Sequence, residues 1–224
     1  MLHVVTWLWG SAYGEHYVRH LAAAVGRNLN EAHRFLALTD RPRFGLGEGV
    51  AQYGIQDIGL TKIKGCIARL RLFDPAYQRD LGIKEGDKVL SLDLDLVVTG
   101  ALDALVTRPE GFSILQGINS NNLCPFNGSV WMLRAGYRPD VWTSFSMDAV
   151  NKIPRHEYPD DQGWLYHMMP DAGAYGPSCG VYGFKKLHWP SGDALPDGAK
   201  VVAFPGWRDP AKFAHIDWIR EHWR

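Results

Sequence analysis

The chain has 224 residues, enough for one well-buried domain and short for two. Its 24 Lys and Arg residues balance its 24 Asp and Glu residues, so the formal net charge is zero. The absence of a net positive charge argues against a protein that binds nucleic acid or anionic lipid through long-range electrostatic attraction. Three widely spaced cysteines without a CxxC pair, no basic leader and no apolar run of about 18 residues lead us to expect a cytoplasmic protein without a transmembrane segment.

Apolar strands alternate with helical stripes through the first part of the chain. Residues 2–8 are mostly apolar and predict a buried strand. The apolar positions that follow recur at helical spacing, as Tyr17, Val18, Leu21, Val25 and Leu29. Further strands are expected at residues 35–38 and 55–58. Because strands alternate with helices, we expect a mostly parallel central sheet flanked by helices.

The second part continues this pattern around one long apolar run. A helical stripe at Ile67, Leu70 and Phe73 precedes residues 89–98, which we expect to form one buried strand. The other predicted elements are strands at 112–115 and 126–133, helices at 139–150, 161–168 and 210–223, and a loop with short strands at 171–198. No repeat or linker interrupts the chain, so the pattern predicts a single α/β, Rossmann-like domain over residues 1–224.

Two carboxylates, Asp93 and Asp95, stand two residues apart inside the apolar run 89–98. Buried carboxylates are costly unless they are paired or bind a metal, and the period of a strand places both on the same side. Oxygen ligands suit Mn²⁺ or Mg²⁺, which keep open positions for the phosphate oxygens of a substrate. The pair therefore predicts a metal site for a phosphorylated ligand. The alternative is an Asp pair that only caps a helix or turn.

Two classes of enzyme place an Asp-x-Asp at the end of a strand for this chemistry. Haloacid-dehalogenase-like phosphohydrolases have it on the first strand, where Asp93 would be the nucleophile and Asp95 the acid/base. Metal-dependent nucleotide-sugar glycosyltransferases have it about a hundred residues into the chain. The position of Asp93 and Asp95 in this chain favours the second class. A phosphohydrolase also needs a second acidic pair after an apolar strand, and no such strand precedes Asp160 and Asp161.

A series of short motifs accompanies the Asp pair. They are residues 9–13 after the first strand, Thr39-Asp40 after the second, residues 65–73 around Arg69, Phe126-Asn127-Gly128-Ser129, and Asp160-Asp161-Gln162. In this order and spacing the chain resembles GT-A-fold nucleotide-diphospho-sugar glycosyltransferases, in particular the family 8-like group. The resemblance implies a GT-A-like domain in which residues 1–100 bind the nucleotide and residues 101–224 bind the sugar and the acceptor.

The resemblance also implies a role for each of these residues. Tyr13 would stack on the nucleotide base, Asp40 would contact the edge of a uracil, and Arg69 would face the phosphates. Asp93 would contact both the ribose and the metal, and Asp95 the metal. Three further residues are implied in catalysis: Asp161 and Gln162 would hold the transferred sugar, and Asn127 would lie near the reacting face.

One segment departs from the pattern of the family. Where the family has a His metal ligand and a Lys for the diphosphate, this chain has Ala203 and Asp209. Gly206 is retained and is assigned to donor binding. The neighbouring Arg208 is the candidate for the missing positive charge, and Asp209 is the candidate third metal ligand.

The resemblance implies transfer of a sugar, with retention, from a nucleotide-diphosphate donor, most simply a UDP-sugar, to an unidentified acceptor. The acceptor could be a saccharide, a protein or a modified nucleobase; basic residues such as Arg41, Arg43, Lys62 and Lys64 are the ground for an anionic acceptor such as modified nucleic acid. Besides the phosphohydrolase, the remaining alternative is a protein that binds nucleotide-sugar without turnover.

Overall fold

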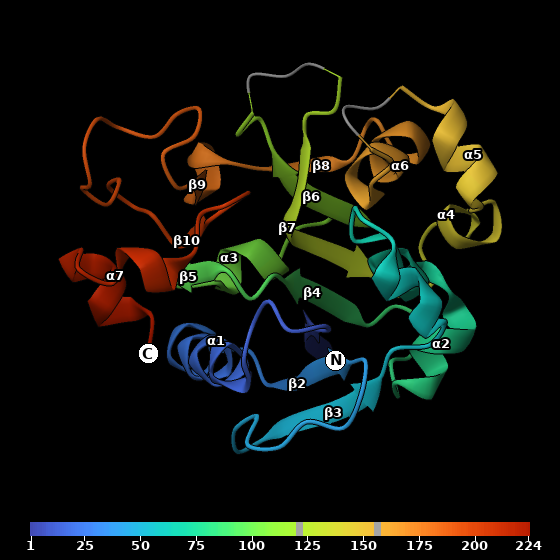
Figure 1. Cartoon of the computed structure of the whole chain (residues 1–224), viewed down its shortest axis with the longest axis horizontal. Coiled ribbons are helices and arrows are strands. Elements are labelled where there is room, and N and C mark those ends of the chain that lie inside the picture. The colour runs from blue at the N-terminus through green and yellow to red at the C-terminus, as the bar shows by residue number, and fades with distance from the viewer. Residues whose placement is uncertain (120–122, 155–157) are drawn as a thin grey trace.

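The computed structural model describes residues 1–119, 123–154 and 158–224, and these build one α/β domain around a seven-stranded sheet (Figure 1). In spatial order its strands are β3 (Val50–Gly54), β2 (His33–Thr39), β1 (Leu2–Leu8), β4 (Lys88–Leu92), β7 (Phe126–Arg134), β6 (Phe112–Gln116) and β8 (Gly173–Tyr175). A three-stranded sheet consists of β5 (Leu96–Val98), β10 (Val201–Ala203) and β9 (Val181–Gly183), in that order.

Most neighbouring strands of the large sheet are parallel, which confirms the predicted fold class. The four strands β3, β2, β1 and β4 all run in the same direction. Strand β7 runs antiparallel to both of its neighbours, β4 and β6, and β8 is parallel to β6. All seven residues of β1 are buried, as expected for a central strand covered on both faces.

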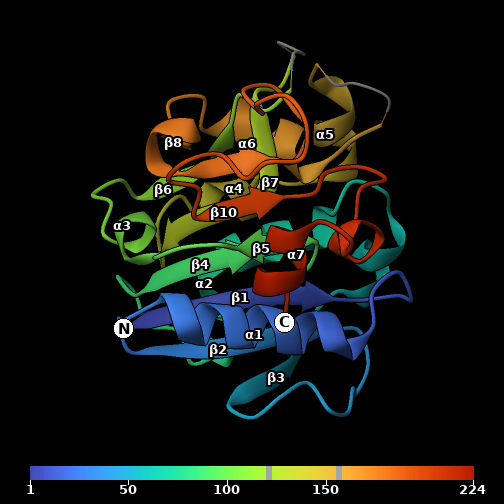
Figure 2. The ribbon, with the colours of Figure 1, turned by 90° about the vertical axis from the view of Figure 1, so that its left-hand side faces the viewer.

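The two faces of the large sheet carry separate hydrophobic cores because side chains alternate along each strand. On one face, Leu2 and Val4 of β1 pack with α1 (Glu15–Asn28), which lies along β1 and β2 in Figure 2. On the other face, Val5 and Trp7 belong to a core shared with the 3₁₀ helix Ile67–Phe73. The remaining α-helices are α2 (Pro75–Asp80), α3 (Asp103–Val106), α4 (Asp140–Thr143), α5 (Met147–Lys152), α6 (Asp161–Met168) and α7 (Asp217–His222).

The apolar run 89–98 is not one strand, which corrects the sequence prediction. Strand β4 ends at Leu92, and β5 begins at Leu96 in the other sheet. The backbone explains the break: the Asp93 N–H donates to the Ser129 carbonyl at 2.9 Å, whereas the Asp95 carbonyl accepts from the Phe204 N–H at 2.9 Å. The chain therefore changes hydrogen-bonding partner between the two carboxylates.

Other predicted boundaries also differ. The third strand lies at residues 50–54 and not at 55–58, where the chain turns into the 3₁₀ helix Ile58–Lys62. The helix expected at 139–150 is interrupted because Ser146 caps a new helix, with its Oγ accepting from the Ala149 N–H at 3.1 Å. The helix expected at 210–223 consists of a 3₁₀ turn, Pro210–Phe213, followed by α7. Across the described ranges, no helix has the length and apolar character needed to cross a membrane.

Candidate functional site

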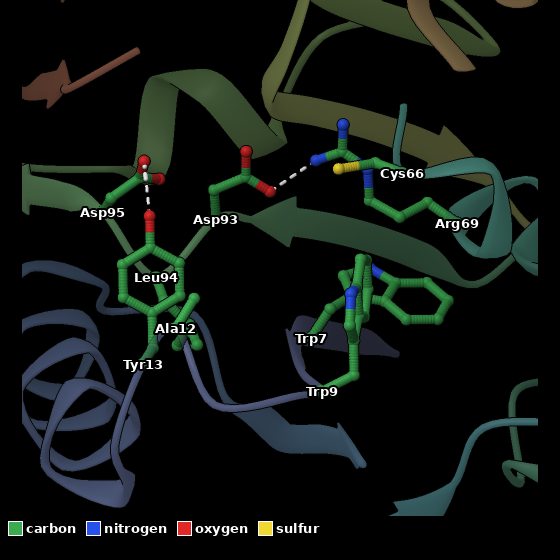
Figure 3. A pocket seen from close by; sticks show the side chains of 9 residues that line it. All are labelled: Trp7, Trp9, Ala12, Tyr13, Cys66, Arg69, Asp93, Leu94 and Asp95. Carbon is green, nitrogen blue, oxygen red and sulfur yellow. Dashed lines mark hydrogen bonds and ion pairs between the residues drawn. The ribbon is translucent and has the colours of Figure 1, made fainter. Parts of the chain in front are cut away.

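A cavity of about 220 Å³ opens at the carboxyl ends of β1 and β4, where parallel sheets commonly bind ligands (Figure 3). Its walls come from the loop after β1, the start of the 3₁₀ helix Ile67–Phe73, and the connection between β4 and β5. The lining residues are Trp7, Trp9, Ala12, Tyr13, Cys66, Arg69, Asp93, Leu94 and Asp95. Four of these, Tyr13, Arg69, Asp93 and Asp95, were predicted site residues.

Asp93 and Asp95 both border the cavity, although they lie in a connection between sheets rather than within a strand. The Asp95 carboxylate accepts a hydrogen bond of 3.0 Å from the Tyr13 hydroxyl. Burial, together with the nearby Asp93 carboxylate, raises the pKa of Asp95 to about 7. A bound cation at this site would be stabilised by the two neighbouring carboxylates, and it would favour the ionised form of Asp95.

The residues present fit part of a divalent metal site. Asp93 and Asp95 supply hard oxygen ligands of the kind that Mn²⁺ and Mg²⁺ prefer. The third candidate, Asp209, accepts a hydrogen bond of 2.9 Å from the Tyr17 hydroxyl and another of 2.8 Å from the Ala211 N–H. Within the described part of the chain, no three His, Cys, Asp or Glu side chains are grouped closely enough to hold a metal ion. A divalent ion held by these two aspartates would therefore keep coordination positions open for water or phosphate oxygens.

Asp209 nevertheless lies in the electrostatic environment of the pair. The ring centroids of Tyr13 and Tyr17 are 4.9 Å apart. The Tyr13 hydroxyl donates to Asp95, and the Tyr17 hydroxyl donates to Asp209. Burial raises the pKa of Tyr13 far above its ordinary value, and the charges of Asp95, Asp93 and Asp209 add to this effect. The two tyrosines are therefore protonated donors that hold the two carboxylates in place.

Arg69 links the cavity to the start of α6. Its side chain is 5% exposed; Nε donates to Asp161 at 2.7 Å, and Nη1 donates to Asp93 and to the Gly128 carbonyl. Burial opposes the charge, but the Asp161 and Asp93 carboxylates hold the pKa of Arg69 well above its ordinary value. The predicted phosphate-facing residue is thus a buried cation shared by two carboxylates, and its contact with phosphate stays a prediction.

Two glycines make room for this arrangement. A Cβ at position 128 would lie 2.3 Å from Nη2 of Arg69. Gly65 has φ +91°, and a Cβ there would lie 2.2 Å from the Pro159 carbonyl oxygen. The Gly65 carbonyl in turn accepts from the Asp161 N–H at 2.8 Å. Close backbone approach therefore explains why glycine occurs in both motifs.

The predicted catalytic residues lie around Arg69 and Gly128. Asp161 is 1% exposed, and burial raises its pKa to about 6; Arg69 binds its Oδ2, whereas its Oδ1 has no hydrogen-bond partner among the residues that the structure describes. The Gln162 Oε1 accepts from the Gly128 N–H at 2.9 Å. The Asn127 Oδ1 accepts from the Ser129 N–H at 3.1 Å. None of the three lines the cavity, although Asp161 binds the lining residue Arg69.

Asp40 lies outside the cavity lining and is already engaged. Its carboxylate accepts from the Gly10 N–H and from Nη2 of Arg43, each at 3.0 Å. These contacts, with the guanidinium of Arg41 nearby, hold the pKa of Asp40 below its ordinary value despite partial burial. Asp40 thereby anchors the loop after β1, and its contact with a base stays a prediction.

The segment after β10 carries Gly206 and Arg208, the two predicted donor-binding residues of this region. Gly206 has φ +80°, a left-handed conformation that favours glycine. The Arg208 guanidinium lies 5.2 Å from the centre of the exposed Trp207 ring. Burial lowers the pKa of Lys186, and the nearby Arg208 charge lowers it further, so these two cations share one region. Neither Gly206 nor Arg208 lines the cavity.

Five lining residues were not predicted as site residues: Trp7, Trp9, Ala12, Cys66 and Leu94. Trp9 and Ala12 had an available signal, because they belong to the loop directly after a parallel strand, where ligands gather. Cys66 has φ +56° at the start of a 3₁₀ helix, and nothing in the sequence indicates this conformation.

Comparison with solved structures gives the fold a context. No known family model and no curated protein matches the chain. The galactosyltransferase LgtC, solved in complex with donor and acceptor sugar analogues, superposes with a TM-score of 0.63 and 13% identity over 98% of this chain and 96% of LgtC. The glycosyltransferase GlyE of Streptococcus pneumoniae superposes with a TM-score of 0.64 and 16% identity.

The match to GlyE covers 99% of this chain and 63% of GlyE. An active-site mutant of LgtC gives a similar result, with a TM-score of 0.61 and 14% identity over 93% of this chain and 89% of that structure. The chain therefore has the fold of these glycosyltransferases, in agreement with the GT-A-like fold that the motifs predict.

Proposed function

We propose that the protein is a metal-dependent glycosyltransferase that transfers a sugar from a nucleotide-diphosphate donor, a UDP-sugar in the simplest case, to an acceptor. The observation that carries this proposal is the pair Asp93 and Asp95 at the cavity, where burial and the Asp93 charge raise the pKa of Asp95 to about 7. A carboxylate pair of this kind is complementary to a cation that itself binds a diphosphate. The fold shared with LgtC and GlyE supports the proposal.

Each group of residues has a separate task in this mechanism. Asp93 and Asp95 would hold Mn²⁺ or Mg²⁺, which stabilises negative charge on a departing diphosphate. Arg208 would add fixed positive potential near the same leaving group. Arg69, fixed between Asp93 and Asp161, keeps the metal side and the sugar side of the site at a constant separation.

Asp161, Gln162 and Asn127 would position the donor sugar. We assign Asp161 Oδ1, which has no partner in the described ranges, as an acceptor for a sugar hydroxyl, and Gln162 as a second polar contact. Asn127, fixed by the Ser129 N–H, would lie near the reacting face. Orientation of this kind supplies a large part of the rate acceleration in group transfer. Retention at the anomeric carbon is proposed from the family resemblance.

The first experiment measures thermal stability with UDP, GDP, ADP and CMP, each with Mn²⁺ or with EDTA. Ligand binding to the folded state raises stability by about 2.7 kcal/mol at a hundredfold excess over the dissociation constant. We expect stabilisation by UDP with Mn²⁺ that is lost with EDTA and in Asp95→Ala. If no nucleotide stabilises the wild type, the proposal is excluded, and the phosphohydrolase alternative should be tested next by phosphatase assays.

A second assay separates the enzyme from a protein that only binds the donor. Slow hydrolysis of a UDP-sugar without an acceptor, measured as released sugar, is expected for the wild type. We expect at least a 100-fold lower rate in Asp161→Asn, because the variant alters a hydrogen bond to the sugar. Donor binding without any release would favour the non-catalytic alternative.

A further inference from the structure

The cavity has a charged side and an aromatic side. Asp93, Asp95 and Arg69 supply its charges, whereas Trp7, Trp9 and Tyr13 supply its aromatic rings. In Figure 3, the Trp9 side chain and the Tyr13 ring lie on opposite sides of the space below Asp93. This division is complementary to a ligand that carries a charged group and a flat ring.

Trp9 is held firmly on its side of the cavity. Its ring packs edge-on against Trp7, with centroids 6.1 Å apart and an interplanar angle of 76°. Trp7 is 6% exposed, and its indole N–H donates to the Ser91 Oγ at 3.4 Å, so it is a rigid support in the core. Trp9 itself is half-buried, and among the described residues its indole N–H donates no hydrogen bond. Its ring is therefore held in position by packing, whereas its indole N–H takes no part in the hydrogen bonds of the described residues.

The loop after Trp9 brings Tyr13 to the opposite side. Gly10 has φ +64°, which turns the chain sharply. The Gly10 N–H donates to Asp40 at 3.0 Å, and the Gly10 carbonyl accepts from Nη2 of Arg43 at 2.7 Å. Both polar groups of the turn are thus fixed. The Tyr13 hydroxyl is fixed in turn by Asp95.

Hydrogen-bonding side chains are scarce on the aromatic side. Ala12 and Leu94 also line the cavity, and they offer no polar side-chain atom. Asp40, the carboxylate expected to contact a base, lies outside the lining and binds Gly10 and Arg43. A flat ring in this part of the cavity would therefore be held by contact with aromatic faces rather than by side-chain hydrogen bonds.

We propose that Trp9 stacks on the planar base of the nucleotide donor and, with Tyr13, forms a two-sided aromatic site for it. This inference rests on the proposed function, since it names the contact that the nucleotide makes in the same cavity. Stacking of a base on an aromatic side chain contributes about 5- to 150-fold in affinity.

The test is calorimetric titration of the full chain in Mn²⁺ with UDP and with inorganic pyrophosphate, which has the same diphosphate group and no base. Trp9→Ala and Trp9→Leu are expected to weaken UDP binding at least fivefold and to change pyrophosphate binding less than twofold. Trp9→Phe, which keeps an aromatic face, is expected to retain most of the UDP affinity. The Phe and Leu variants separate stacking from simple filling of space.

Trp142→Ala is the matched control. Trp142 is also half-buried and packs against the same hydrophobic core as Trp9, but it lies on α4 and outside the cavity lining. Loss of a tryptophan from that core should lower thermal stability in both Trp142→Ala and Trp9→Ala. UDP affinity should fall in Trp9→Ala and Trp9→Leu but not in Trp142→Ala. Quenching of tryptophan fluorescence by UDP should likewise persist in Trp142→Phe and decrease in Trp9→Phe.

Two results would overturn the inference. If the wild type binds UDP and all three Trp9 variants bind it equally well, the stacking role is wrong and the proposed transferase function stands. Equal losses of UDP and pyrophosphate affinity would show that Trp9 supports the diphosphate side and would also exclude stacking. If the wild type binds neither ligand in the presence of metal, the proposed function itself fails.

Discussion

Ionisation of the Asp95 side chain is unfavourable in the folded protein. Its carboxylate is removed from water and faces Asp93, and the Tyr13 hydroxyl compensates only in part. These effects raise the pKa of Asp95 to about 7, so the folded protein binds this proton far more tightly than the unfolded chain does. A group with a raised folded-state pKa lowers stability as the pH rises through the window between the two values.

This sign predicts how Asp95→Asn will behave in EDTA. From about pH 4 to pH 7 the free energy of unfolding of the wild type should fall, because Asp95 loses its proton in the folded state. Asn carries no charge, so the variant should gain at least about 1 kcal/mol relative to the wild type between pH 5 and pH 8. Urea unfolding at the two pH values measures the difference. A constant difference would contradict the raised pKa, and Mn²⁺ should stabilise only the wild type at pH 8.

The elements around the site are joined by one guanidinium. Arg69 comes from the 3₁₀ helix Ile67–Phe73 and binds the β4–β5 connection through Asp93, α6 through Asp161 and β7 through the Gly128 carbonyl. Breaking a buried ion pair leaves an uncompensated charge, which costs several kcal/mol. The fit of these elements around Arg69 therefore determines the shape of the site as well as its charge.

Gly128→Ala tests the closeness of β7 to Arg69. A Cβ at this position would lie 2.3 Å from Nη2, so the guanidinium would have to move. We expect a loss of about 1–3 kcal/mol of unfolding free energy, the usual effect of overpacking, together with weaker UDP binding. Gly26→Ala is the control, because a Cβ in that part of α1 meets nothing within 4 Å and should stabilise the helix by about 0.5–1 kcal/mol. Equal stability of Gly128→Ala and wild type would show that Arg69 is not confined.

At the scale of the whole molecule, the small sheet is part of the main hydrophobic core. Val98 of β5 and Val201 of β10 belong to the same buried cluster as α1 and β1. At the end of the chain, Trp223 packs near His20 of α1, with ring centroids 4.7 Å apart, and Arg27 donates to the Arg224 carbonyl at 2.8 Å. Helix α1 and the residues that follow α7 are therefore packed against each other.

Shared burial predicts a single cooperative unfolding transition. Val201→Ala removes buried methyl groups from β10, where Val201 is fully buried, and should destabilise the whole domain by about 2 kcal/mol. Near- and far-ultraviolet circular dichroism in urea should report the same shifted midpoint. Two separate transitions would mean that the small sheet folds independently of the large one.

Local patterns in the sequence determined the strands and helices that are buried and long. The apolar run of β1 and the helical stripe of α1 carry their own periodicity, so the predicted residues 2–8 and 17–29 nearly match the observed elements. The mostly parallel α/β architecture follows from the alternation of these elements. The sequence also indicated Asp93 and Asp95, because carboxylates inside an apolar run are costly unless they are paired or bind a metal. Arg69 and Tyr13 were indicated only by the family resemblance, and both line the cavity.

Only the tertiary structure decided where the chain changes sheets and which partner each polar group has. Residues 89–98 look like one strand, yet Ser129 and Phe204, distant in sequence, bind the backbone on either side of Leu94 and divide the run. Asp40 is bound to Arg43, Asp209 to Tyr17, and Arg69 to two carboxylates. Such pairings depend on distances between segments that are remote along the chain, and local periodicity carries no information about those distances.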